Sequence, residues 1–250
     1  MFNGKAPPVR TIVIRSYKEE AGQLYYLPIG YPDREENWRT SDPSDVLVAR
    51  TFWLGTDRYG RDLLSRLLIG SRISLSVGLV AVVISLLIGI PLGALAGYYG
   101  GRIDAVIQWF LQVVWSIPTL LLVIAITLAL GKGFWQVFVA IGLTMWVEVA
   151  RVVRGEVMRQ SKMDYVDAAR VLGLPRPFIL AKHILPNALS PLIVVSAANF
   201  AAAILVESGL SFLGLGAQPP IPSWGGIIKD HYAYILMGKP WLTLAPGLLI

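Results

Sequence analysis

Long apolar runs separated by short polar segments dominate the chain from residue 73 onward. A helix rises 1.5 Å per residue, so about 20 apolar residues cross the ~30 Å hydrocarbon layer of a bilayer. The pattern predicts four such spans and a fifth apolar run, at residues 73–97, 105–130, 134–153, 188–210 and 235–250. The sequence therefore predicts an all-α integral membrane protein, built as a polytopic helical bundle.

Glycines recur at helical spacing in the first predicted span. Gly89, Gly93 and Gly97 are four residues apart, which predicts a helix face that a second helix approaches closely. A hinge is the alternative role for these glycines. Pro91 lies between them and is expected to bend the span.

Polar side chains also occur inside the predicted spans. In a membrane such groups face protein or water rather than lipid tails. We therefore take four residues as candidates for a translocation pathway: Gln108, Gln112, Asn199 and Glu207. Hydrogen bonding between helices is the alternative for the amides, and a position near the membrane interface is the alternative for Glu207.

The segment before the first span has a helical stripe of leucines. Residues 60–72 carry this stripe at positions 63, 64, 67 and 68, and Asp62 and Arg66 have the i,i+4 spacing of an ion pair. We expect an amphipathic helix that lies along the membrane surface and leads into the first span. A soluble core helix is the alternative.

The first 52 residues are polar and irregular, with prolines at positions 7, 8, 28, 32 and 43. Short apolar alternations at residues 11–14 and 24–27 suggest a small hairpin. We expect residues 1–52 to form a loop region with some β-structure, and residues 53–250 to form the transmembrane domain.

A polar segment, Ser161–Asn187, interrupts the apolar runs, and we call it the polar loop. Ser161 is predicted to cap a short helix. Gly173 is predicted to end that helix in the left-handed conformation, which glycine adopts without steric cost. Pro175 and Pro177 prevent continuation and favour a second short helix. One face of the first helix has side chains at helical spacing: Tyr165, Ala168, Ala169 and Leu172.

Charge predicts the orientation of the bundle. Residues 151–182 carry seven Lys and Arg, whereas the turn at Gly131 carries one and residues 211–239 carry two. Basic residues accumulate in cytoplasmic loops, so the polar loop is predicted to be cytoplasmic and the N-terminal region extracytoplasmic. A chain that starts outside needs an earlier span, so we expect this sequence to lack its first transmembrane helix and the end of its last.

Chemistry for catalysis is not visible in the sequence. The chain has no cysteine, only two histidines, no G-x-x-x-x-G-K-[ST] loop, no HExxH and no G-x-S-x-G. We expect no catalytic residue, metal or cofactor. The net charge of +6 comes from basic residues beside apolar spans, which favours membrane topology over nucleic-acid binding.

Several motifs resemble one family. Asp167-Ala168-Ala169, Gly173 and Ile184-Leu185-Pro186 resemble the EAA loop of permease subunits in binding-protein-dependent ABC importers, which usually has Glu where Asp167 stands. YVDAARVLG, HILPN, LGTDRYGRDLLSRLLIGSRISL (54–75) and LVESGLSFLGLGAQPPIPSWG (205–225) are similar to C-type oligopeptide and dipeptide permeases. The resemblance covers residues 53–250.

The resemblance implies a multi-pass protein of the inner membrane that carries peptides. Its implied partners are two ABC ATPase subunits, a second homologous permease subunit in a heterodimer, an extracytoplasmic solute-binding protein and membrane lipid. The polar loop would couple to the ATPases through these residues: Asp167, Ala168, Ala169, Gly173, Leu185 and Pro186.

Other functions remain as alternatives. An importer of nickel or another small solute has the same scaffold. An ion-coupled secondary transporter needs charged relays in several spans, and only Glu148 and Glu207 qualify. A membrane-embedded hydrolase lacks a nucleophile and a base.

Overall fold

The computed structural model describes residues 12, 14–20, 23–28, 36–39, 51–131, 133–218 and 221–250. The chain divides into two units, which are described separately. The first unit comprises residues 1–68 and 231–243, and the second comprises residues 69–230 and 244–250.

The first unit contains an antiparallel sheet of three strands in the order β1 (Ile14–Glu20), β2 (Gln23–Pro28) and β3 (Glu36–Arg39). Alternate residues of β2 are buried, as expected for a strand with one covered face. A hairpin is present, and the alternation at 24–27 lies in its second strand, β2. Its first strand is β1, which includes only Ile14 of the other predicted alternation. Residues 11 and 13 of the other predicted alternation lie outside the described residues.

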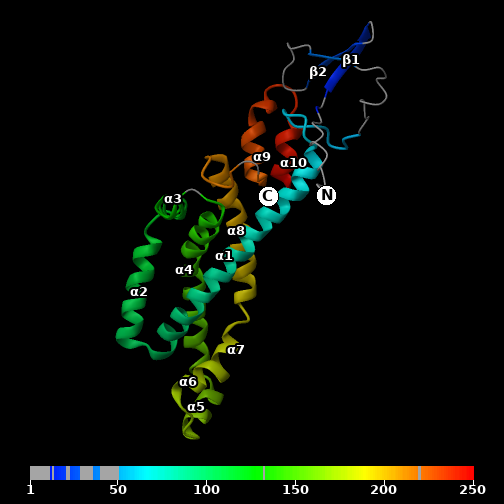
Figure 1. Ribbon diagram of the computed structural model, residues 1–250. Helices are drawn as coiled ribbons and strands as arrows, with labels where there is room; N and C mark the ends of the chain where they lie inside the picture. Colours follow the sequence, from blue (N-terminus) through cyan, green and yellow to red (C-terminus); the bar gives the residue numbers. More distant parts are fainter. Residues whose placement is uncertain are drawn as a thin grey trace, which may run out of the picture. The chain divides into compact units, whose positions relative to one another are not determined.

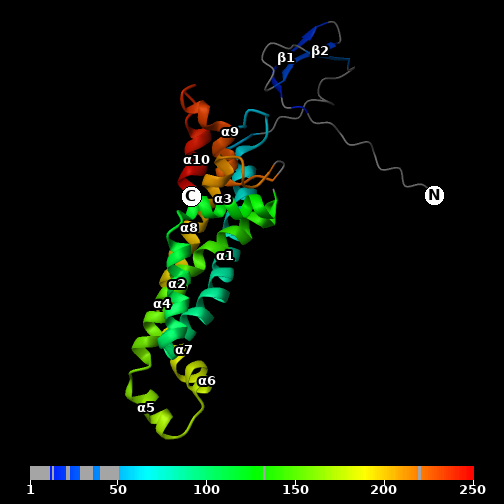
Figure 2. The same cartoon turned by 90° about the vertical axis from the view of Figure 1, so that its left-hand side faces the viewer.

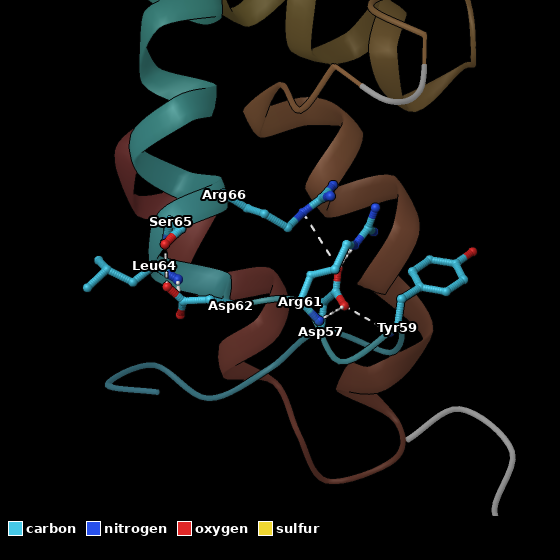
Figure 3. Close-up of polar contacts among 7 residues, drawn as sticks. All are labelled: Asp57, Tyr59, Arg61, Asp62, Leu64, Ser65 and Arg66. Atoms are coloured by element: carbon cyan, nitrogen blue, oxygen red, sulfur yellow. Dashed lines mark hydrogen bonds and ion pairs between the residues drawn. The ribbon is translucent and has the colours of Figure 1, made fainter. Parts of the chain in front are cut away.

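A tight turn precedes the first helix. The carboxylate of Asp57 is buried and accepts hydrogen bonds from the backbone N–H groups of Tyr59 (2.8 Å) and Arg61 (2.9 Å). The side chain of Arg61 binds the same carboxylate at 2.6 Å, and Arg66 approaches it to 3.6 Å (Figure 3). The turn is therefore organised around one buried acid.

Asp62 caps the first helix. Its carboxylate accepts the backbone N–H groups of Leu64 and Ser65 at 3.3 and 3.2 Å, the arrangement of an N-cap side chain. The predicted ion pair between Asp62 and Arg66 is wrong, because the cap engages Asp62 and the ion pair of Arg66 is with Asp57.

Helix α1 (Leu63–Tyr99) is one unbroken helix of 37 residues (Figure 1). At 1.5 Å per residue it is about 55 Å long, well beyond the thickness of a hydrocarbon layer. The prediction of a separate surface helix ending at Arg72 is therefore wrong. Pro91 lies inside the helix without ending it.

The glycines of α1 face helix α4 (Phe134–Gln160). A Cβ on Gly93 would lie 2.4 Å from the carbonyl oxygen of Ala150, and one on Gly97 would lie 2.6 Å from that of Arg154. A Cβ on Gly89 would meet the side chain of Val149 at 2.6 Å. The predicted close approach of a second helix is confirmed.

The second predicted span is not a single helix. Helices α2 (Gly101–Trp115) and α3 (Thr119–Leu130) meet at an angle of 89°. Pro118 has no N–H to donate and adopts an extended ψ of 126°. A proline also disfavours the helical conformation of the residue before it, here Ile117. These effects favour a break at Pro118. Asp104 and Arg154 join α2 to α4 through two hydrogen bonds of 2.6 Å.

The remaining helices complete the second unit and part of the first. They are α5 (Asp164–Val171), α6 (Arg176–Phe178), the π-helical turn η2 (Ile179–Ile184), α7 (Leu185–Ala188), α8 (Leu192–Phe212), α9 (Trp224–His231), the 3-10 turn η3 (Tyr232–Ile235) and α10 (Trp241–Leu249). Among the described residues, α1, α4 and α8 are long and apolar enough to cross a membrane, and α2 with α3 forms a fourth, bent candidate. The predicted class of a polytopic helical membrane protein is confirmed, with the small sheet β1–β3 in addition to the helices.

One apolar core joins α1, α3, α4 and α8 around residues such as Val77, Val123, Ile141 and Ala203. A second core lies where the polar loop meets α1, α4 and α8. Helices α5, α6 and α7 gather at the same end of α4 and α8 in both views (Figures 1 and 2).

Candidate functional site

The polar loop is a packed element. Val166 and Ala169 of α5 and Ile179 and Ile184 of η2 are buried in one apolar cluster, which also contains Val157 near the end of α4. Side chains in such a core interdigitate and have little freedom to move independently. A displacement of the loop is therefore coupled to α4.

Helix α5 ends as the sequence predicts but begins differently. Gly173 has a φ of +74°, and its N–H donates to the carbonyl of Arg170 at 3.0 Å. The N–H of Leu174 donates to the carbonyl of Ala169 at 3.2 Å, which completes a Schellman motif. The predicted left-handed glycine is confirmed.

The predicted N-cap is wrong. Ser161 continues the last turn of α4, and its hydroxyl donates to the carbonyl of Met158 at 3.0 Å. Met163 precedes α5 and provides no side-chain cap. The long apolar contact of α4 with the loop extends that helix to Gln160, so Ser161 is too early to cap α5.

The predicted coupling residues divide between the surface and the core. Asp167, Ala168, Gly173 and Pro186 are exposed and Leu185 is half-buried. Ala169 is only 5% exposed and packs inside the loop. A contact of these residues with an ATPase stays a prediction.

Two large apolar side chains stand out on the polar loop. Val171 is 87% exposed and Leu172 is 78% exposed, at the end of α5 beside Gly173. The sequence pattern predicted Leu172 on a helix face, but neither residue was predicted as a contact. The feature that indicates such a contact is a pair of adjacent aliphatic residues before the terminal glycine of a helix in a polar segment.

Asp167 has a basic partner within the loop itself. Its carboxylate accepts a hydrogen bond from Arg170 at 2.9 Å, and both side chains are exposed. Exposed pairs of this kind contribute little to stability. The pair instead fixes a charge pattern on the outer face of α5.

The four pathway candidates do not lie together. Gln112 is exposed and Gln108 is half-buried on α2, whereas Asn199 and Glu207 are buried on α8. Of the four, only Asn199 lines a cavity of about 330 Å³, which lies among α2, α3, α4 and α8. Glu148 of α4 and Thr144, one turn earlier, line the same cavity.

Glu207 lies in a different, closed environment. It is 1% exposed, and its Oε1 accepts a hydrogen bond from the hydroxyl of Ser211 at 2.6 Å. The hydroxyl of Ser223 donates to Ser211 at 3.1 Å and accepts the backbone N–H of Gly226 at 3.1 Å. Glu207 is therefore enclosed by protein, and its depth in the membrane stays a prediction. Pathway roles for these residues stay predictions.

Metal binding has no evident centre in the residues that the structure describes. They contain no group of three or more His, Cys, Asp or Glu side chains that could hold an ion. The chemistry available is hydrogen bonding and charge, presented inside a helical bundle.

A family model matches residues 89–250, and its description is binding-protein-dependent transport system inner membrane component. The oligopeptide transport system permease protein OppC of Haemophilus influenzae is 38% identical over 226 residues, which cover 90% of this chain and 71% of that protein. The dipeptide transport system permease protein DppC of Bacillus subtilis is 42% identical over 198 residues, covering 79% of this chain and 62% of that protein. The chain thus spans 62–71% of the length of these two relatives.

A solved structure shares the fold. A chain from the inward-facing MetNI methionine ABC transporter matches with a TM-score of 0.60 at 20% identity, over 75% of this chain and 87% of that chain. At this identity the likeness concerns the fold alone.

Proposed function

The chain belongs to the inner membrane components of binding-protein-dependent transport systems, and from that premise we propose that it is the permease subunit of an ATP-driven importer of dipeptides and oligopeptides. The observation that carries the proposal is the 38–42% identity to peptide permeases over most of the chain. A solute-binding protein delivers peptide from outside, and separate ATPase subunits hydrolyse ATP. A second, related permease completes the pathway as a heterodimer.

The surface proposed to meet an ATPase subunit is the exposed end of α5. Ala168 and Gly173 allow close approach of another backbone, and Val171 and Leu172 provide the apolar area. Large apolar side chains that are this exposed on a polar loop favour burial in a partner. Ala169, by contrast, supports this surface from inside.

The connection from this surface to the spans supports a coupling role. The apolar cluster under α5 contains residues of the loop, α4, α1 and α8, among them Val166, Val157, Ala94 and Leu192. Closely packed elements move as bodies because their contacts are not continuously deformable. Closure of the ATPases would therefore rock the spans through α5.

The first test uses Gly173. A Cβ there meets no atom within 4 Å, so a substitution strains the backbone at φ +74° without a clash. Gly173→Val is expected to accumulate normally, at a cost of about 1–2 kcal/mol in the left-handed region. Because α5 and the following turn are then misdirected, we expect the ATPase subunits to co-purify weakly and peptide uptake to be lost.

Gly155→Val is the matched control. Its Cβ also meets nothing within 4 Å, but Gly155 lies on α4 with an ordinary helical φ. We expect it to retain ATPase association and uptake. Full ATPase association and uptake in Gly173→Val would contradict the proposed coupling surface.

A further inference from the structure

The cavity at the break between α2 and α3 combines apolar walls with a few polar groups. Leu122, Met145 and Val206 contribute apolar surface, and Glu148 and Asn199 contribute polar atoms. Binding sites for small molecules have this composition, in which apolar walls exclude water and a few polar groups orient the ligand.

Asn199 lines this cavity and carries an unused donor. The side chain is 2% exposed, and its Nδ2 has no hydrogen-bond acceptor in the described part of the chain. Buried amide groups are nearly always paired, because leaving one unpaired forfeits its hydration. A ligand that enters the cavity with a carbonyl oxygen would satisfy this donor.

Glu148 presents an unused negative charge to the same cavity. It lies near the middle of α4, is exposed, and makes no ion pair or hydrogen bond with the residues that the structure describes. The cation one turn away, Arg151, is placed with its guanidinium 4.0 Å over the ring of Trp115. A carboxylate at this position in a candidate span requires a cation or water.

The helix break adds further donors. Pro118 and Thr119 line the cavity at the start of α3, and no side chain caps the first N–H groups of that helix. Interrupted membrane helices expose such backbone groups to substrates in other transport proteins. The lining of the cavity therefore contains one anionic group, the amide of Asn199 and the start of a helix.

The carboxylate of Glu148 and the amide donor of Asn199 together favour a ligand that carries both a cation and a hydrogen-bond acceptor. A metal ion would find one carboxylate here and no group of three His, Cys, Asp or Glu side chains among the described residues, and it would leave the Nδ2 of Asn199 without an acceptor. An anion would use the donors but not Glu148. The amino-terminal residue of a peptide carries an ammonium group and a carbonyl oxygen close together, and so matches both.

We propose that this cavity binds the amino-terminal end of the transported peptide, with Glu148 holding the α-ammonium group and Asn199 donating to the first peptide carbonyl. The inference rests on the proposed function of peptide import. Every unmodified peptide has these groups. The site therefore binds the amino-terminal end of the backbone and does not discriminate between peptide side chains.

The test uses the complete transporter with its binding protein in proteoliposomes. Uptake is measured for a dipeptide and for its desamino analogue, in which hydrogen replaces the ammonium group. We expect Glu148→Gln to reduce dipeptide uptake about tenfold, which is 1.4 kcal/mol. Desamino uptake should change little, so discrimination between the two is lost. Glu148→Asp should retain most of the discrimination between the dipeptide and its desamino analogue.

The control is Glu156→Gln, which removes a carboxylate from the same helix, where Glu156 pairs with Arg159 at 2.6 Å outside the cavity. It should transport as the wild type does. A photoreactive group on the first residue of the peptide gives a measurement that does not depend on rates. Its cross-links should map to residues 144–148 and 199–206.

The outcomes separate the two proposals. If the wild type takes up no peptide, the proposed function is wrong and this inference falls with it. If the wild type takes up peptide and Glu148→Gln keeps the same discrimination and the same cross-links, only the binding site is overturned.

Discussion

Two carboxylates in apolar helices, Glu148 on α4 and Glu207 on α8, have opposite surroundings. Glu207 is 1% exposed and bonded through Ser211 to Ser223. Glu148 is exposed beside a cavity and has no partner in the described residues. The same residue type in two apolar helices is therefore expected to have two different roles.

The environment of Glu207 joins helices. Ser223 lies just before α9 and accepts the N–H of Gly226, which ties the start of that helix to α8 through Ser211. A Cβ on Gly225 would lie 2.4 Å from the carbonyl oxygen of Ser208 on α8, so the backbones touch. The carboxylate is part of a tight junction.

Glu148, by contrast, makes no hydrogen bond or ion pair that connects α4 to another described helix. The helix break at Pro118 lies beside the same cavity, and the Nδ2 of Asn199 on α8 has no hydrogen-bond acceptor among the described residues. A polar group that makes no internal contact at membrane depth destabilises the free chain unless water or a ligand solvates it. The comparison therefore separates an enclosed acid, with Oε1 paired and Oε2 without a hydrogen-bond partner in the described residues, from an acid that faces a cavity. The first fits a structural role, and the second fits the binding role proposed above.

The largest expected effect is at the junction. Gly225→Val would force a side chain against the backbone of Ser208, which cannot yield as a flexible side chain does. We expect a loss of about 3 kcal/mol or more and poor accumulation of folded protein in size-exclusion chromatography. Gly209→Val is the control, because a Cβ there meets nothing within 4 Å. Equal yields of both variants would show that the junction is not tight.

The sequence predicted the apolar runs of α1, α4 and α8 well, because an apolar run of sufficient length has few alternatives to a membrane helix. It missed the bend in the second run, and in the fifth run only the nine residues of α10 are α-helical. It did not distinguish the two prolines. Pro91 is tolerated inside α1, whereas Pro118 divides α2 from α3. Both lie in apolar runs, and the difference depends on packing around each helix.

Prediction of the sites was uneven for similar reasons. Gly173 was predictable, because backbone geometry at a helix end demands glycine locally. The burial of Ala169 was not, because alanine suits both a core and a contact surface. Glu148 and Asn199 are 51 residues apart, and only the bend after α2 and the packing of α4 on α8 bring them to one cavity.

The second prediction concerns Glu207 itself. Glu207→Ala removes the acceptor of the Ser211 hydroxyl and leaves a void, for a loss of about 2–3 kcal/mol. Glu207→Gln keeps the shape and one oxygen acceptor, so its loss should be about 1 kcal/mol. Thermal unfolding of the detergent-purified chain measures both. An alanine variant as stable as the wild type would remove the structural role assigned to Glu207.

The smallest effect on stability is expected at Glu148, where the effect on uptake should be substantial. Glu148→Gln removes a charge that no described residue pairs with and leaves the packing unchanged. Its stability should therefore stay within about 0.5 kcal/mol of the wild type, with any shift towards greater stability. The same thermal unfolding assay, run beside Glu207→Ala, checks this. Binding sites retain groups that are unfavourable in the free protein because a ligand satisfies them, so stability and transport should separate at this residue. If Glu148→Gln unfolds as early as Glu207→Ala, then Glu148 also holds helices together and the contrast between the two acids disappears.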